Sequence, residues 1–135
     1  MIQLDQEIYK ENILDHYKNP RNFEGMLMCS VVQKDTNPLC GDKIEMYAQI
    51  SDAGMLEKLT FKGSGCAISL AAASMLTEML PGKPTNDIQQ MGQKEIVDML
   101  GISIGIARMK CAMLGLRTLQ KGLVTYQLTH SASLN

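Results

Sequence analysis

The chain has 135 residues and a net charge of −1, and 45% of its residues are hydrophobic. This length predicts a single domain, residues 1–135, with enough apolar side chains for a core. The near-neutral charge and the absence of Trp argue against a nucleic-acid partner and against binding to a charged membrane surface. The N-terminus is too polar for a signal peptide, and no apolar stretch reaches the roughly 18 residues of a membrane span. We therefore expect a cytoplasmic protein without a membrane partner.

The first expected element is a helix over residues 5–17, for which Asp5 is a candidate N-cap. Ile13 and Tyr17 fall four residues apart and belong to one apolar stripe. His16 lies beside that stripe. A lone helical His is more often a packing or surface residue than a metal ligand, and we interpret His16 in that way.

Three strands are expected next, over residues 26–34, 43–50 and 55–62, from their β-branched residues and from the alternation of apolar and polar residues. Residues 51–54 end in Gly and form a hairpin loop between the second and third strands. Strands so close in sequence pair antiparallel, which predicts a three-stranded meander. Cys29 falls in the first strand, with no Asp, Gly or second Cys beside it, and is interpreted as a small core residue.

The second half of the chain carries apolar residues at helical spacing and predicts four helices, over residues 67–80, 85–91, 93–100 and 107–121. Gly122 is a natural residue to end the last helix, and residues 123–135 have little pattern. We therefore expect a core of about residues 5–122 and a loosely held tail. A helix, a meander and then helices make an α+β fold, with the helices packed on one face of the antiparallel sheet.

The first group of candidate functional residues lies in the segment Asn37-Pro38-Leu39-Cys40-Gly41-Asp42. Pro38 fixes its own φ angle and Gly41 accepts φ values that other residues avoid, which indicates a tight loop before the second strand. Cys40 and Asp42 lie two residues apart on this loop. Their side chains are therefore able to point at a common ligand.

Two further cysteines are expected where loops meet helices. Cys66 follows Gly63-Ser64-Gly65 and opens a helix, where the positive end of the helix dipole favours its thiolate. Cys111 lies in the first turns of the last helix beside Arg108 and Lys110, whose charges also favour the thiolate. From the residues alone, a packed and inert side chain is an equally good interpretation of each cysteine.

The four cysteines of a cytoplasmic protein stay reduced, which favours metal binding or thiol chemistry over disulfides. Cys40, Cys66 and Cys111 together with Asp42 make a four-ligand set suited to zinc or to the iron of a cluster. Their spacing contains no CxxC pair and is weak evidence by itself. Their positions at the ends of predicted elements add weight, because sites are often built there.

Three motifs follow one another in the chain: residues 37–42, Gly63-Ser64-Gly65-Cys66-Ala67-Ile68-Ser69, and Lys110-Cys111-Ala112. Together with residues 13–23, they resemble the U-type iron–sulfur cluster assembly proteins, the family of IscU, SufU and the NifU N-terminal domain. The resemblance covers about residues 5–122. It implies an α+β fold in which the three cysteines and the aspartate converge at one end and hold zinc or a nascent [2Fe–2S] cluster.

The resemblance implies a function in iron–sulfur cluster assembly. The protein would be a scaffold, not itself an enzyme, that receives sulfur from a cysteine desulfurase, builds a [2Fe–2S] cluster on the three cysteines and Asp42, and passes it to acceptor proteins. Cys111 is the first candidate to accept persulfide sulfur and Cys66 is the second, with Lys110 as a candidate modulator of that step. We expect a monomer or a weak homo-oligomer.

The residues around Cys111 leave alternatives open. Proteins of the IscU branch carry a His before the third Cys and an LPPVK motif, whereas this chain has Lys110 and lacks that motif. Residues 108–112 look more like SufU, whose members often act as zinc-dependent acceptors of sulfur from a cysteine desulfurase. This resemblance implies that the protein holds zinc as isolated. The stretch from Cys66 to Cys111 leaves little room for the insertion usual in SufU. A structural zinc domain is a lesser alternative, because structural sites prefer a closed Cys/His shell and Asp42 does not fit one.

Overall fold

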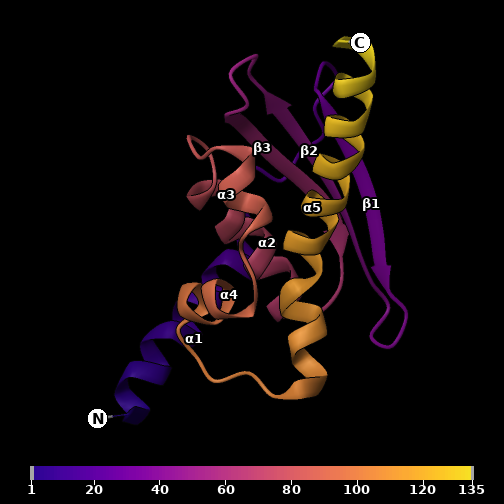
Figure 1. Cartoon of the computed structure of the whole chain (residues 1–135). Coiled ribbons are helices and arrows are strands. Elements are labelled where there is room, and N and C mark those ends of the chain that lie inside the picture. The colour runs from indigo at the N-terminus through magenta and orange to yellow at the C-terminus, as the bar shows by residue number, and fades with distance from the viewer. Residues whose placement is uncertain (1, 135) are drawn as a thin grey trace.

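The computed structural model describes the backbone of residues 2–134 and the side chains of residues 10–130. Within these residues a helix is followed by three strands and then by further helices (Figure 1). The bounds are α1 Ile2–Lys18, β1 Val31–Asn37, β2 Asp42–Ile50, β3 Leu56–Ser64, α2 Ala67–Met79, α3 Thr85–Gln89, α4 Gln93–Leu100 and α5 Ile106–Leu134. This order confirms the predicted α+β layout.

The three strands form one antiparallel sheet in the order β1-β2-β3, which confirms the predicted meander. The central strand β2 shows which face of the sheet is covered. Ile44, Met46, Ala48 and Ile50 are buried, whereas the residues between them are exposed or half-buried. Alternation along a strand places these four side chains on one face, so the sheet has one core face.

The helices cover that core face. α2 lies against β3, α5 lies against β1 and β2, and α1 packs on α2 (Figure 1). Small side chains let α2 and α5 approach each other closely: a Cβ added to Gly115 on α5 would lie 3.3 Å from Ala73 Cα on α2. α4 contacts both of these helices, and α3 contacts α5. The predicted packing of the helices on one face of the sheet is therefore confirmed.

The first strand begins later than the sequence indicated. β1 starts at Val31, the first of two β-branched residues, so Cys29 precedes the strand. Leu27 and Met28 before it are exposed. Cys29 is half-buried, and its thiol donates a hydrogen bond to the Met26 carbonyl 3.3 Å away. The interpretation of Cys29 as a core residue within a strand was therefore wrong.

The last helix is longer than predicted. α5 continues through Gly122 to Leu134, and Leu123 is fully buried, so the predicted helix end at Lys121 was wrong. Gly122 does not have the positive φ of a helix-ending glycine. A Cβ at Gly122 would lie 2.5 Å from Val31 Cγ1, which shows that this glycine lets α5 cross β1 closely. The other predicted helix bounds agree within two residues, except for the start of α1.

The first helix begins before the predicted N-cap. α1 starts at Ile2, so Asp5 lies inside it, and the Asp5 side chain falls outside the described residues. Ile13 is buried, whereas Tyr17 is partly exposed. His16 is buried as well, and its Nδ1 lies 2.8 Å from Ser74 Oγ on α2. His16 therefore packs α1 on α2, as interpreted from the sequence. Among the described helices, none has the length and hydropathy to cross a membrane.

Candidate metal centre

The loop between β1 and β2 is built on Asn37. The Asn37 carbonyl accepts hydrogen bonds from Gly41 N at 2.8 Å and from Cys40 N at 3.2 Å. Its side-chain Oδ1 accepts a third hydrogen bond, from Leu39 N at 3.3 Å. Gly41 has a φ of 72°, a left-handed conformation that favours glycine. The loop therefore turns tightly, leaves Cys40 exposed and leads into β2 at Asp42.

The Asp42 side chain is fully buried although it is a carboxylic acid. Its Oδ1 accepts a hydrogen bond from the backbone N of Cys66 at 2.9 Å. Its Oδ2 is buried and has no hydrogen-bond partner among the described residues. A buried polar atom without a partner costs on the order of 1–3 kcal/mol. Such an atom is expected where a bound ion completes a site.

Two glycines, one at the end of β3 and one just after it, allow this part of the chain to approach the start of β2 closely. A Cβ added to Gly65 would lie 2.3 Å from Asp42 Oδ1, and one added to Gly63 would lie 2.2 Å from the Lys43 carbonyl. Gly63 is still part of β3, where it pairs with Ile44. The strand thus continues two residues beyond its predicted end, and the glycines serve the close approach of β3 to the start of β2.

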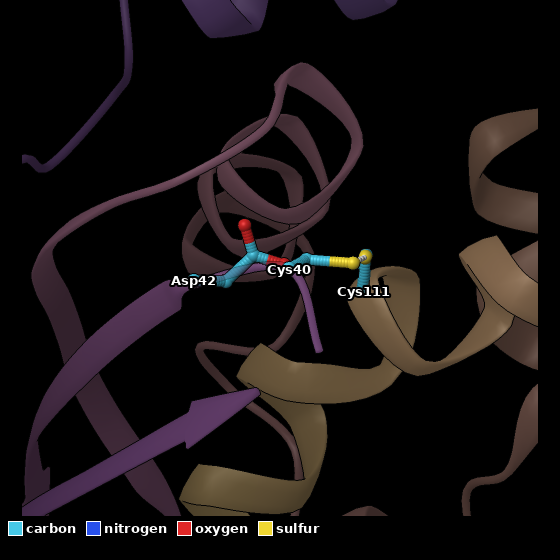
Figure 2. Close-up of side chains that lie close together, drawn as sticks. All are labelled: Cys40, Asp42 and Cys111. Carbon is cyan, nitrogen blue, oxygen red and sulfur yellow. Dashed lines mark hydrogen bonds between the residues drawn. The ribbon is translucent and has the colours of Figure 1, made fainter. Parts of the chain in front are cut away.

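Cys111 lies in the first turns of α5, and only 2% of its surface is exposed. Its Sγ lies 3.2 Å from Cys40 Sγ and 3.5 Å from Asn37 Nδ2. Figure 2 shows the two cysteine side chains pointing toward each other. Burial raises the pKa of the Cys111 thiol, and its neighbours Cys40, Asp42 and Cys66 add to the rise. The cations beside it on α5 do not outweigh these effects, so the expectation that they favour its thiolate was wrong. A metal cation bound at this place would favour the deprotonated form.

One ligand atom from each of Cys40, Asp42 and Cys111 lies within 4.8 Å of the others. These side chains come from the β1–β2 loop, the start of β2 and the start of α5, and Figure 2 shows them close together at one end of the sheet. Two sulfurs and a carboxylate oxygen suit zinc or iron. Three of the four predicted ligand residues are thus brought together, and their binding of a metal stays a prediction.

Cys66, the fourth predicted ligand, borders this group. It is exposed and immediately precedes α2, and its Sγ lies 3.7 Å from Ser69 Oγ. Among the described side chains, its thiol is outside the group of ligand atoms within 4.8 Å. Its backbone N–H nevertheless holds Asp42, and its thiol adds to the raised pKa of Cys111. Its binding of a metal as the fourth ligand stays a prediction.

Lys110, the candidate modulator, is exposed. It lines a groove of about 380 Å³ beside the Cys40 loop, together with Leu39, Arg117 and Lys121. The described residues show no hydrogen bond or ion pair between Lys110 and a cysteine. Its influence on Cys111 therefore stays a prediction.

Asn37 is a site residue that the sequence indicated only as part of a loop motif. Its side chain is buried, with 7% exposed, and donates to the sulfur of Cys111. The dipeptide Asn37-Pro38 is a turn signal, and it could have identified the role of Asn37 in the loop. The contact with Cys111 is tertiary, so no local pattern could have indicated it.

Comparisons with known proteins identify the family of this chain. The family model described as the NifU-like N terminal domain matches residues 8–132. The zinc-dependent sulfurtransferase SufU of Bacillus subtilis (strain 168) is 38% identical, over 86% of this chain and 89% of that protein. The iron–sulfur cluster assembly scaffold protein IscU of Aquifex aeolicus (strain VF5) is 34% identical, over 87% of this chain and 75% of that protein.

Two solved structures share the fold. A putative iron–sulfur cluster assembly scaffold protein for the SUF system from Fervidobacterium islandicum AW-1 has a TM-score of 0.75 at 23% identity, covering 87% of this chain and 97% of that one. A NifU-like N-terminal protein from Brucella abortus also has a TM-score of 0.75, at 15% identity, covering 94% of this chain and 98% of that one. The family model and the curated relatives establish the conclusion that the motifs indicated: this chain belongs to the NifU-like N-terminal domain family.

Proposed function

We propose that the protein is an iron–sulfur cluster assembly scaffold. The observation that carries this proposal is the buried Asp42 carboxylate. One of its oxygens has no hydrogen-bond partner among the described residues, and the carboxylate is grouped within 4.8 Å with the Cys40 and Cys111 sulfurs. A carboxylate oxygen is a poorer ligand for the iron of an iron–sulfur cluster than a thiolate is. A site with one such ligand is suited to hold the cargo and then release it. Relatives named IscU and SufU support the proposal.

Cys40, Cys66, Cys111 and Asp42 would hold the metal. Bound zinc or iron supplies a positive centre that keeps thiols deprotonated. The chain contributes the geometry: β2 and α5 fix Asp42 and Cys111, whereas Cys40 and Cys66 lie on loop segments at the surface. Two fixed and two accessible ligands would let the site stay formed while cargo is exchanged.

Sulfur delivery would proceed by transfer from the persulfide of a cysteine desulfurase. A thiolate of this chain attacks the outer sulfur, forms a new S–S bond and displaces the desulfurase cysteine as a thiolate, so that atoms and charge balance. Two electrons from a protein reductant then convert the transferred sulfur to sulfide for the cluster. Acceptor proteins with free thiolates would take the completed [2Fe–2S] cargo.

The thiols differ in their access to such a persulfide. Cys111 is the first candidate from the sequence, but it is buried, with 2% of its surface exposed. Cys66, the second candidate, and Cys40 are both exposed. Attack by Cys111 would require the Cys40 loop to move aside. Mass spectrometry of peptides after incubation with desulfurase and cysteine would locate the added sulfur. Sulfur found only on Cys40 would contradict both candidates.

A second candidate function is a zinc-dependent sulfurtransferase that accepts persulfide and activates a desulfurase. It is favoured by the relative named SufU, which is 38% identical over most of this chain. In that case zinc would hold the site together and a cysteine would carry the sulfur. A purely structural zinc domain is a weaker candidate, because Asp42 departs from the closed Cys/His shell of structural sites.

Anaerobic reconstitution distinguishes the two main candidates. The protein is incubated with ferrous iron, cysteine, a cysteine desulfurase and a reductant, and absorption and metal content are measured after gel filtration. A scaffold gains a visible chromophore with iron and sulfide in equal amounts and passes it to an apo-ferredoxin. A colourless protein that retains zinc and accelerates the desulfurase would contradict the scaffold and support the sulfurtransferase.

A further inference from the structure

Asn37 contacts the most deeply buried thiol of the candidate metal centre. Its Nδ2 lies 3.5 Å from Cys111 Sγ, and this contact joins the end of β1 to the start of α5. Both side chains are buried, with 7% of Asn37 and 2% of Cys111 exposed. The contact is therefore shielded from water, where a hydrogen bond to sulfur is electrostatically stronger than it is at a surface.

The rest of the Asn37 side chain determines which of its two polar groups faces the sulfur. Its Oδ1 accepts a hydrogen bond from Leu39 N at 3.3 Å. A backbone N–H donates and does not accept, so the group beside Leu39 has to be the amide oxygen. The amide NH₂ is thereby left pointing at Cys111, with a hydrogen to donate.

We propose that Asn37 is a positioning residue that donates an N–H hydrogen bond to the Cys111 sulfur when that sulfur binds a metal, and so strengthens metal binding. This inference rests on the proposed function of the site. The other close neighbours of Cys111 are Cys40, Asp42 and Cys66, which are anionic or become anionic when they bind a metal. Among the described side chains, Asn37 alone donates an N–H to this sulfur.

The effect on metal binding follows from the burial of Cys111. A buried thiolate has no water to solvate its charge, so the amide hydrogen replaces part of that solvation. A hydrogen bond to a ligand also fixes its orientation toward the metal. Removal of such an outer partner typically weakens metal binding by about 10-fold to 100-fold. It also changes the electron density on the sulfur, which charge-transfer spectra of a thiolate–metal bond report.

Two substitutions separate this donor from the role of Asn37 in the loop. Asn37→Asp keeps an oxygen for Leu39 N but removes the amide donor. Asn37→Leu has a similar size and removes both the donor and the acceptor. Asn12→Asp is the matched control, because it makes the same chemical change at an exposed position of α1, outside the centre. All three are measured in the full chain beside the unsubstituted protein.

The probes are zinc and cobalt(II) alone. Zinc affinity is measured by competition with a chelator, the sulfur-to-cobalt charge-transfer band by absorption, and the melting temperature of the metal-free protein by circular dichroism. We expect both Asn37 variants to bind zinc about tenfold more weakly or worse and to shift the cobalt band. Metal-free Asn37→Asp should melt within a few degrees of the parent, and Asn12→Asp should match the parent in all three measurements.

Two results would overturn the inference. One is an unchanged cobalt band in Asn37→Asp with a lowered melting temperature, which would make Asn37 a loop brace only. The other is tighter zinc binding by Asn37→Asp, which would mean that a carboxylate at this position serves as a ligand. An unsubstituted protein that binds neither metal would instead contradict the proposed metal centre itself, and the inference with it.

Discussion

Asp42 combines two roles in one buried side chain. One oxygen accepts the backbone N–H of Cys66 and so ties the start of β2 to the start of α2. The other oxygen has no hydrogen-bond partner among the described residues, and we propose it as a metal ligand. The hydrogen bond from Cys66 N shows that Asp42 braces two segments that are distant in the sequence, whereas its effect on the release of cargo stays a prediction.

Substitution of Asp42 by Ala tests whether its second oxygen limits how long cargo stays bound. We expect the assembled cluster of Asp42→Ala to outlast that of the parent and to transfer more slowly. The metal-free melting temperature should fall by only a few degrees, because a lost hydrogen bond worth about 1 kcal/mol is offset by removal of an unpartnered buried oxygen. Absorption decay and thermal melting measure the two effects. The expectation would be contradicted if Asp42→Ala melted at a much lower temperature and its cluster did not outlast that of the parent. Asp42 would then only brace the fold.

The four cysteines of the chain allow an internally controlled test of the ligand set. We expect Cys40→Ser, Cys66→Ser and Cys111→Ser each to lower zinc affinity by well over tenfold, because each change removes a proposed direct ligand. Cys29→Ser should retain the affinity of the parent, because Cys29 lies before β1 and its thiol bonds to its own loop. Metal content and chelator competition on the purified variants provide the measurement. Equal loss from Cys29→Ser would refute the assignment.

At the scale of elements, close crossings determine where the site forms. α5 carries Cys111 to the loop of Cys40 only because it crosses β1 closely at Gly122, one of the tightest approaches at the described glycines. A Cβ at Gly122 would lie 2.5 Å from Val31 Cγ1. The position of the third cysteine therefore depends on a glycine three turns further along the same helix.

Gly122→Ala tests this crossing, with two effects of opposite sign. Ala in a helix interior favours folding by about 1 kcal/mol over Gly, whereas overpacking costs about 1–3 kcal/mol. Because Val31 is buried and cannot move aside freely, we expect net destabilisation in denaturant unfolding. Gly105→Ala is the control, since a Cβ there meets open space and should leave stability nearly unchanged. Stabilisation by Gly122→Ala would contradict the close crossing.

The contact of α1 with α2 should make stability depend on pH. Burial lowers the pKa of His16, and the nearby Arg21 lowers it further, while Glu78 and Asp15 oppose them. The unfolded chain therefore binds a proton at a higher pH than the folded protein does. Stability should fall as the pH drops from about 6.5 toward the lower folded pKa. His16→Gln should flatten this dependence in urea unfolding of the metal-free protein, and an unchanged slope would exclude His16 as its source.

At the scale of the whole molecule, the sequence predicted the fold because its patterns are local. The alternation in β2 and the apolar stripes of α2 and α5 each reflect burial of one face. The end of α5 was not predictable in this way. Gly122 looks like a helix stop in sequence, and only its contact with β1 shows why a glycine is needed inside the helix.

The candidate site was predictable in part, because some of its signals are local in the sequence. Cys40 and Asp42 were recognisable from their loop, and Cys66 and Cys111 from their places at helix starts. The burial of Cys111 and its bond from Asn37 depend on packing between segments distant in the sequence. The position of the Cys66 thiol beside Ser69 is a side-chain conformation that no sequence pattern specifies.

X-ray absorption at the zinc edge of the zinc-loaded protein tests the ligand set most directly. Binding by Cys40, Cys66, Cys111 and Asp42 predicts three sulfur neighbours at about 2.3 Å and one oxygen at about 2.0–2.2 Å, with that oxygen lost or replaced by water in Asp42→Ala. A shell of four sulfurs would contradict the role of Asp42. A shell without sulfur would contradict the metal centre altogether.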